Sequence, residues 1–164
     1  MSKTNQQQKE KTLQIKIPDG GYPRRLFFNR LQVQHDEEFC LIHFGLVSRD
    51  GILLDAYSCA ISALTLAQNR DSLLSYKEHL HGFDPSGVRL WQGGKNGLAT
   101  DVADIITMSV NSNTAETCLS LFSMTAASRY RSDPDAQPTA QAIALLRSSV
   151  EMQRQLIEEL YANA

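Results

Sequence analysis

The spacing of apolar residues changes near residue 60, and this change limits the folds that the chain can adopt. Before it, apolar and polar side chains alternate, as in Leu13, Ile15 and Ile17. A period of two residues is typical of β-strands with one buried face. From Ala63 to Leu80 the period is close to 3.6 residues, which predicts an amphipathic helix. The first half is therefore predicted to fold as several strands followed by one helix.

Four strands are expected before this helix, at residues 13–17, 25–34, 38–48 and 52–59. The third is apolar in both alternating sets, which indicates a central strand covered on both faces. Asp50-Gly51 follows it, a dipeptide favoured in tight hairpin turns because both central residues need positive φ. Short turns of this kind predict a mostly antiparallel sheet. Ser62 is expected to cap the helix with its hydroxyl.

The second half of the chain repeats this pattern with a shift near 77 residues. The strand Ile15–Ile17 with its double glycine reappears as Val88–Leu90 followed by Gly93-Gly94. In the later strands, the matches are Phe28, Leu31, Val33, Cys40, Leu41 and Phe44 with Ile105, Met108, Val110, Cys118, Leu119 and Phe122. In the helices, they are Ala63, Leu66, Ala67, Arg70, Leu73, Lys77 and Leu80 with Ala140, Ile143, Ala144, Arg147, Val150, Arg154 and Ile157. Two sheets with helices can also share such alternation by chance.

The repeat sets the expected boundaries in the second half. Residues 128–132 are predicted as its fourth strand, and the final helix is expected from Pro138 to about Tyr161, because proline suits a first helical turn. A unit of about 75 residues buries too little surface to be stable alone, so the two units should pack together.

The predicted fold class is therefore α+β: a tandem β-β-β-β-α repeat with antiparallel sheets, helices packed on one face and pseudo-two-fold symmetry. Residues 1–11 are polar and rich in glutamine, and we expect them to form a disordered tail. Residues 12–164 should form a single pseudo-dimeric domain. Repeat one covers about 12–84 and repeat two about 85–164.

This order of elements resembles the Whirly and PUR-repeat group of single-stranded nucleic-acid-binding proteins. The resemblance rests on element order alone, and no binding residue of those families is carried over because their sequence motifs are absent. Residues Phe28 to Leu80, which include Asn29-Arg30-Leu31-Gln32-Val33 and Phe44-Gly45, are also similar to a family of short, functionally uncharacterised bacterial proteins. That similarity implies no activity.

Charge and cysteine content exclude several classes of protein. Sixteen basic and eighteen acidic residues give a net charge of −2, so no global field favours nucleic acid or a membrane. The three cysteines, Cys40, Cys59 and Cys118, lie in apolar segments without paired spacing, which favours reduced buried thiols. No apolar run approaches the ~20 residues of a membrane span, and the amino terminus does not resemble a secretory signal. We therefore expect a cytoplasmic protein without a membrane partner.

The sequence offers little that would support catalysis. His79 and His81 are two residues apart, which on a helix points them to different sides and does not suit a metal. His43 is interpreted as a satisfied core or interface histidine. The Gly93–Gly97 loop lacks a phosphate-loop motif, and a Gly-x-Ser-x-Gly elbow is absent. We expect no catalytic residues, no metal and no cofactor, and hence a protein that is not an enzyme.

Basic and aromatic residues alternate at corresponding places in the two halves, and these are the candidate site residues: Tyr22, Arg24, Arg25 and Arg30 in the first half, with Arg89, Trp91 and Lys95 in the second. Aromatic rings that stack on bases, together with cations that follow the backbone, are typical of single-stranded nucleic-acid binding. The sequence thus predicts binding of single-stranded DNA or RNA through an exposed sheet face.

A second interpretation of the same residues stays open. Phe27 and Phe28 could belong to the core, with the arginines as a solvated rim. The chain would then be a protein-interaction or oligomeric assembly module, in which exposed sheet edges or helices form a homo-oligomer.

Overall fold

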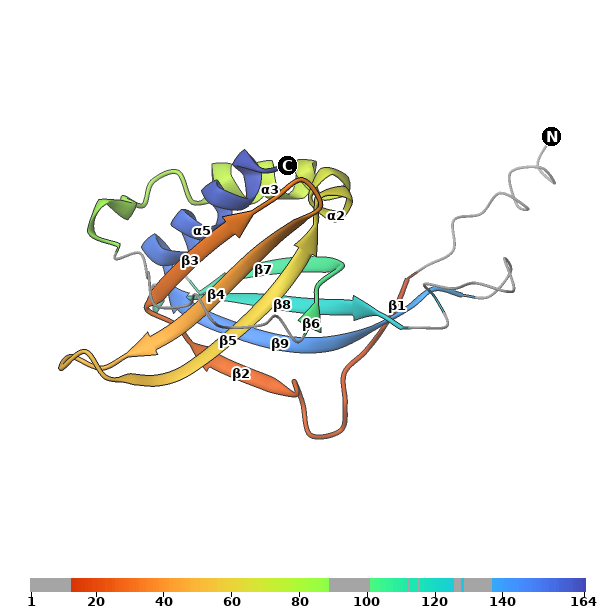
Figure 1. Ribbon diagram of the computed structural model, residues 1–164, viewed down its shortest axis with the longest axis horizontal. Helices are drawn as coiled ribbons and strands as arrows, with labels where there is room; N and C mark the ends of the chain where they lie inside the picture. The colour runs from red at the N-terminus through yellow and green to blue at the C-terminus, as the bar shows by residue number, and fades with distance from the viewer. Residues whose placement is uncertain (1–12, 89–100, 112, 115, 126–127, 129–136) are drawn as a thin grey trace.

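The computed structural model describes residues 13–88, 101–111, 113–114, 116–125, 128 and 137–164. In these ranges the chain forms two mixed β-sheets and three α-helices, an α+β fold in which the helices lie along one side of the sheets (Figure 1). The tail predicted for residues 1–11 lies outside the described residues.

Sheet A contains strands from both halves of the chain: β1 (Gln14–Lys16), β2 (Arg24–Phe27), β7 (Ile105–Asn111), β8 (Glu116–Met124) and β9 (Thr139–Ser149). Strands β7, β8 and β9 are antiparallel, whereas β1 and β2 both pair in parallel with β9. The prediction of antiparallel sheets therefore holds only in part. Strand β1 is shorter and more open than its alternation predicts, since Ile15 is 45% exposed.

Sheet B has the order β3-β4-β5-β6 and also takes a strand from the other half. It comprises β3 (Arg30–His35), β4 (Phe39–Val47), β5 (Leu53–Ser62) and β6 (Asp101–Val102). Strands β3, β4 and β5 are antiparallel, and β6 runs parallel to β5. Each half of the chain thus contributes strands to both sheets.

The predicted strand 25–34 is divided between the two sheets at Phe28-Asn29. The Phe28 amide donates to the Arg147 carbonyl of sheet A at 2.9 Å, and the Asn29 amide donates to the Gly45 carbonyl of sheet B at 2.9 Å. The Asn29 side chain holds this crossing because it donates to the Val47 carbonyl and accepts from the Val47 amide, both at 2.8 Å. Alternation of apolar and polar residues could not reveal that the chain crosses from sheet A to sheet B, because strands of both sheets have the same period of two residues.

The helices are α2 (Ala63–Gln68), α3 (Arg70–His79) and α5 (Val150–Ala162), with a 3-10 turn, η1, at Pro85–Gly87. Ser62 caps α2 as predicted, its hydroxyl accepting from the Thr65 amide at 3.1 Å. Ser149 caps α5 in the same way, accepting from the Met152 amide at 3.3 Å. The single helix predicted over 63–80 is interrupted at Asn69, which separates α2 from α3.

The predicted start of the final helix at Pro138 is wrong, because residues 139–149 form strand β9 and the helix begins at Val150. Arg147 therefore lies on a strand and does not correspond to Arg70 of α3. The reason is that small alanines fit a helix stripe as well as a strand, and pairing with β8 decides between them. Most of the predicted strand 128–132 lies outside the described residues, and β9 is the strand that precedes the helix.

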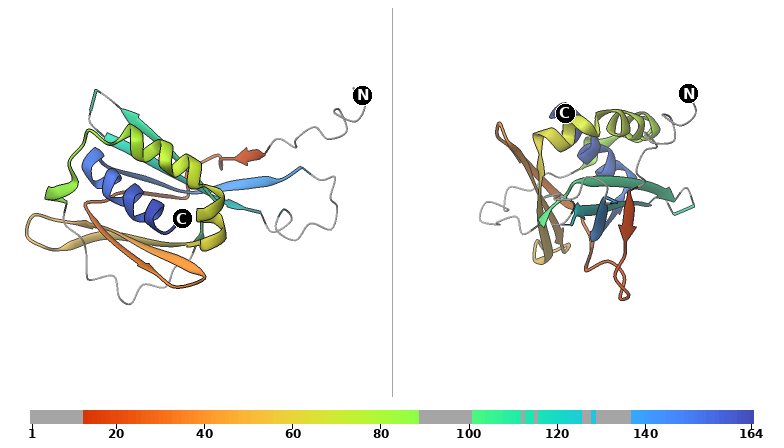
Figure 2. Two further views of the ribbon diagram at one scale, coloured as in Figure 1. Left: turned by 90° about the horizontal axis from the view of Figure 1, so that it is seen from above. Right: turned by 90° about the vertical axis from the view of Figure 1, so that its right-hand side faces the viewer.

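The core lies between the two sheets and the helices, with α3 and α5 side by side (Figure 2). The predicted stripe of Leu66, Leu73 and Leu80 is at most 1% exposed, which confirms its burial. Phe28 and Phe44 are fully buried and meet edge to face, with ring centroids 4.9 Å apart. Large apolar side chains from both sheets thus share one core with the helices.

The thiols are free, and two of them are buried as predicted. Cys40 and Cys59 belong to the core, where burial raises the pKa of Cys40 to about 11. Cys118 is only half-buried, on the opposite face of sheet A from the core.

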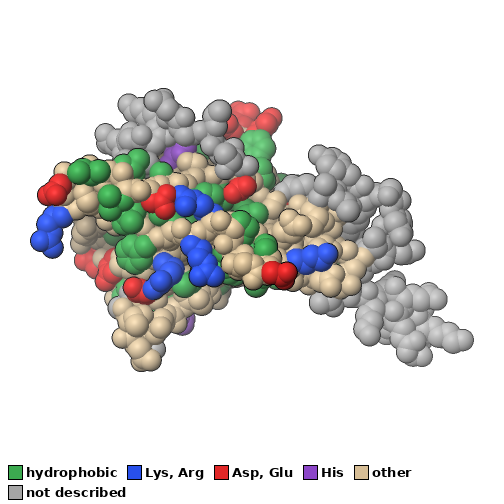
Figure 3. All heavy atoms as spheres, turned by 90° about the horizontal axis from the view of Figure 1, so that it is seen from below, with side chains coloured by type: hydrophobic (Ala, Val, Ile, Leu, Met, Phe, Trp, Pro, Cys, Tyr) green, Lys and Arg blue, Asp and Glu red, His purple; other side chains and the backbone are tan. Residues whose placement is uncertain are grey.

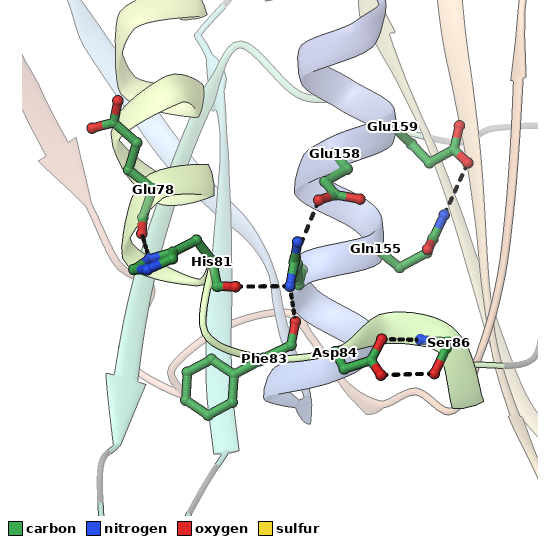
Figure 4. A network of polar contacts seen from close by, with 9 residues as sticks. Glu78, His81, Phe83, Asp84, Ser86, Gln155, Glu158 and Glu159 are labelled. Carbon is green, nitrogen blue, oxygen red and sulfur yellow. Dashed lines mark hydrogen bonds and ion pairs between the residues drawn. The ribbon is translucent and has the colours of Figure 1, made fainter.

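Arg154 joins α5 to the segment that follows α3, and Figure 4 labels its partners His81, Phe83 and Glu158. Its guanidinium donates to the carbonyl of His81 at 2.9 Å and also to the carbonyl of Phe83. A third hydrogen bond goes to the Glu158 carboxylate at 3.1 Å, one helical turn further along α5. The partly buried guanidinium of Arg154 thus fixes the end of the first half against helix α5.

Candidate nucleic-acid interface

The outer face of sheet A is the surface formed by side chains of β2, β9, β8 and β7 that point away from the core. Strand register places them in two adjacent rows, the first being Phe27, Arg147, Cys118 and Ser109. The second row is Arg25, Leu145, Ser120 and Thr107. The alternating residues Leu26, Leu119 and Leu146 are buried on the other side of the sheet. Alternation thus separates a core face from an open face.

A groove of about 610 Å³ lies on this outer face. Its lining comes from three neighbouring strands: Ser109, Val110, Asn111, Glu116, Cys118, Leu145 and Arg147. The lining side chains are mostly small or polar, so the groove presents hydroxyl and amide groups. Such a surface can accept an extended chain lying across the strands.

The outer face carries two arginines in different electrostatic states. Arg147 forms an ion pair with Glu116, with Nη2 2.6 Å from Oε2, and this carboxylate raises the pKa of Arg147. Arg25 is exposed and has no ion-pair partner among the residues that the structure describes. Within the described residues, the face therefore offers one guanidinium without an ion-pair partner, that of Arg25.

Among the aromatic side chains of this region, the ring of Phe27 is exposed, whereas those of Phe28 and Tyr22 are packed against other residues. Phe27 is 40% exposed beside Arg147, whereas Phe28 is in the core. Tyr22 donates to the Ser120 hydroxyl at 3.3 Å, and its ring tilts against Phe122 at 6.2 Å between centroids. Tyr22 therefore covers one end of the outer face, and Phe27 is the ring that faces solvent.

Two other predicted site residues lie elsewhere. Arg24 points to the opposite side of β2 from Arg25 and forms an ion pair with Asp55 of sheet B, which lowers the pKa of that carboxyl. Arg30 begins β3 in sheet B and donates to the Asn29 carbonyl at 2.9 Å. Arg89, Trp91 and Lys95 lie outside the described residues. Of the predicted set, the outer face of sheet A brings together Tyr22 and Arg25.

Sequence reasoning missed Arg147 and Cys118 as members of this face. The repeat of about 77 residues predicts a helix at Arg147, although Ala140, Ala142, Ala144 and Leu146 recur with the period of two that indicates a strand. That signal could have placed Arg147 opposite the buried set. Its position next to Phe27 depends on pairing between distant strands, which the sequence does not show.

Charge across the molecule is mixed. On the face drawn in Figure 3, basic side chains lie beside acidic ones, so a broad basic surface is not present on the described part of that face. The described residues contain no group of three or more His, Cys, Asp or Glu arranged to hold a metal ion. They also contain no helix of sufficient length and apolar character to cross a membrane.

His43 is a buried titratable side chain of sheet B. It is 2% exposed in β4, and its Nδ1 lies 2.6 Å from the Ser58 hydroxyl of β5. Burial lowers the pKa of His43. The ring is thus held neutral within sheet B, where a single hydrogen bond satisfies Nδ1.

Comparison with known proteins returns no matching family, no matching curated protein and no matching solved structure.

Proposed function

We propose that this protein binds single-stranded DNA or RNA on the outer face of sheet A and performs no catalysis. The observation that carries the proposal is the adjacency of Arg25, Phe27 and Arg147 on two neighbouring strands of one open face. Adjacent strands are about 4.8 Å apart, so the ring and both cations lie within one nucleotide's reach of each other. Stacking on the ring and contact of phosphates with the cations are the two interactions that such ligands use.

The rest of the face supports an extended ligand. Ser109 lies in the same row as Arg147, and Thr107 and Ser120 lie in the same row as Arg25; their hydroxyls can donate to phosphate or base acceptors. The modest charge of the face predicts weak affinity that depends strongly on salt. DNA and RNA present the same phosphates and ring faces here, so both belong in the test.

We also infer that the two halves derive from one β-β-β-β-α unit. In each half a long antiparallel hairpin, β4–β5 or β8–β9, leads directly into a helix that begins at a serine cap, Ser62 or Ser149. The strands before these hairpins, β2 and β6, pair in parallel with the last strand of the other half. This arrangement favours pseudo-two-fold symmetry and a likeness in element order to the Whirly and PUR-repeat group.

The binding proposal is tested by fluorescence anisotropy with labelled oligo-dT and oligo-U at about 50 mM salt, where phosphate contacts are least screened. Binding should weaken as salt rises, with a slope of about −0.7 per phosphate contacted. Arg25→Glu should weaken binding and flatten that slope. Arg49→Glu is the matched control, because Arg49 is exposed in the turn between β4 and β5. Absence of binding at low salt, or equal loss in both variants, would refute the proposal.

Stacking is tested separately from charge. Phe27→Ala should lose about 1–3 kcal/mol of binding free energy if one base stacks on the ring. Phe39→Ala removes a ring of the same exposure, 39% against 40%, from sheet B and should leave affinity unchanged. Similar affinity of the two variants would exclude Phe27 from the interface.

A further inference from the structure

Strand β3 forms the border of sheet B, with β4 as its strand partner in the described part of the chain (Figure 2). The Asp36 amide donates to the Phe39 carbonyl at 3.0 Å, and the Ala63 amide donates to the Glu38 carbonyl at 2.8 Å. In an antiparallel ladder, successive residues turn their backbone groups to opposite sides. Even-numbered residues of β3 therefore bond to β4, and the backbone groups of Leu31, Val33 and His35 point outward.

The outward groups of β3 match a second copy of themselves. If two β3 strands pair antiparallel about a two-fold axis at Val33, Val33 meets Val33, and Leu31 meets His35. These three residues are the ones with outward N–H and C=O groups, so every pair can form ladder hydrogen bonds. A row of backbone N–H and C=O groups without strand partners is a template on which another strand can pair.

The same register brings opposite charges together. Arg30 lies opposite Asp36 of the second copy, twice by symmetry, with Gln32 opposite Gln34 between them. Arg30 uses Nη1 for the Asn29 carbonyl, and Asp36 uses Oδ1 for two backbone amides of its own turn. The remaining guanidinium nitrogens and Asp36 Oδ2 are therefore open to an intermolecular ion pair.

A small pocket lies where the second Arg30 would arrive. It measures about 190 Å³ and is lined by Gln34, His35, Asp36, Phe39 and Leu41. Phe39 is 39% exposed, so the aliphatic stem of an arginine can pack on its ring while the head reaches Asp36. The pocket thus combines an apolar wall with a carboxylate.

Strand β7, one border of sheet A, does not offer the same match. Strand β7 contains no charged residue, and the Tyr76 hydroxyl of α3 donates to its Ile106 carbonyl at 3.4 Å. A helix side chain thus already uses a carbonyl of that strand. We propose that the protein forms a homodimer through antiparallel pairing of β3 with β3 of a second copy, which makes sheet B continuous across the dimer.

Sedimentation velocity across about 1 µM to 1 mM protein covers weak and tight association. The mass should rise from 18.3 kDa toward twice that value. Val33→Pro should stay monomeric, because proline lacks the N–H at the two-fold axis, and that N–H does not bond to β4. Val33→Ala removes the side chain but keeps the N–H, and it should still dimerise. Circular dichroism checks that both variants are folded.

A charge exchange tests the register itself. Arg30→Glu and Asp36→Arg each place like charges opposite one another and should weaken self-association about tenfold or more. When the two variants are mixed, both contacts become complementary, so a heterodimer should form. The proposal is overturned if the wild-type protein stays at 18.3 kDa throughout, if Val33→Pro dimerises like Val33→Ala, or if the mixture stays monomeric.

These tests distinguish failure of the dimerisation proposal from failure of the nucleic-acid-binding proposal. Arg25 lies in sheet A, away from β3, so Arg25→Glu should dimerise as the wild type does. If the wild-type protein dimerises but binds no oligonucleotide at low salt, only the proposed function is refuted.

Discussion

Arg154 of α5 donates a hydrogen bond to the backbone carbonyl of His81 at 2.9 Å, across 73 residues of sequence. His81 and Phe83 follow α3, which ends at His79, so their carbonyls lie outside the hydrogen bonds of that helix. The Arg154 guanidinium satisfies both carbonyls, and a cation at this end also interacts favourably with the dipole of α3. The contact therefore anchors the end of one half on the last helix of the other.

We expect Arg154→Met to lower the free energy of unfolding by about 1–3 kcal/mol, because it leaves these carbonyls without a donor. The side chain is only 23% exposed, so water replaces it poorly. Arg147→Met is the control, since its ion pair with Glu116 is half exposed and such pairs contribute at most about 1 kcal/mol. Urea denaturation measures both, and equal losses would contradict the anchoring role of Arg154.

Leu73→Ala should cost about 2–5 kcal/mol of stability through lost burial and a cavity in the core. Leu73 is fully buried on α3, whereas its neighbour Leu74 is 36% exposed. Leu74→Ala should therefore cost far less in the same denaturant titration. If the two variants were equally stable, the helix stripe would not face the core.

Gly21→Ala should destabilise the turn before β2 by about 1–2 kcal/mol, because φ is +88° at Gly21 and alanine is strained there. A Cβ atom at this position would also lie 2.7 Å from Arg25 Nη2, so the arginine would have to move. Gly20→Ala is the control, since nothing lies within 4 Å of a Cβ there. Thermal unfolding should separate the two variants, and an equal effect would show that Gly21 is not constrained.

Stability should fall as the pH is lowered from about 7.5 to 5.5, because His43 is held neutral by burial with a pKa below its ordinary value of 6.5. In this range the unfolded chain takes up a proton at position 43 that the folded chain does not. Protons therefore favour unfolding until the pH reaches the folded pKa. His43→Gln should flatten the dependence of the melting temperature on pH. Asp36, Asp55 and Asp84 have lowered pKa values and contribute at lower pH. An unchanged profile in the variant would contradict this assignment.

The sequence predicted local structure well where one periodic pattern fits one element. The alternation in 38–48 and the stripe of Leu66, Leu73 and Leu80 correspond to β4 and to the buried side of α2 and α3. It failed where a pattern fits two structures, as in the alanines of β9. Small side chains leave the choice to the neighbouring strand.

The candidate site was predictable only in part, for a geometric reason. Arg24 and Arg25 are the same type of residue, but successive side chains on a strand point to opposite faces. Which of them faces solvent depends on where Leu26 packs. Arg147 joins Arg25 only because β2 pairs with β9, and such contacts between distant segments leave no trace in local periodicity.

The pairing of β2 with β9 also governs the order of events during synthesis. Strand β2, which begins at Arg24, can pair with β9 only after Ala144 has left the ribosome. The β4–β5 hairpin can close earlier. Contacts between distant segments form slowly, because the chain must first close a long loop. Until then β2 presents an unpaired edge that can join another nascent chain. This protein should therefore need its whole length to fold, and shortened chains that end before β9 should accumulate as aggregates.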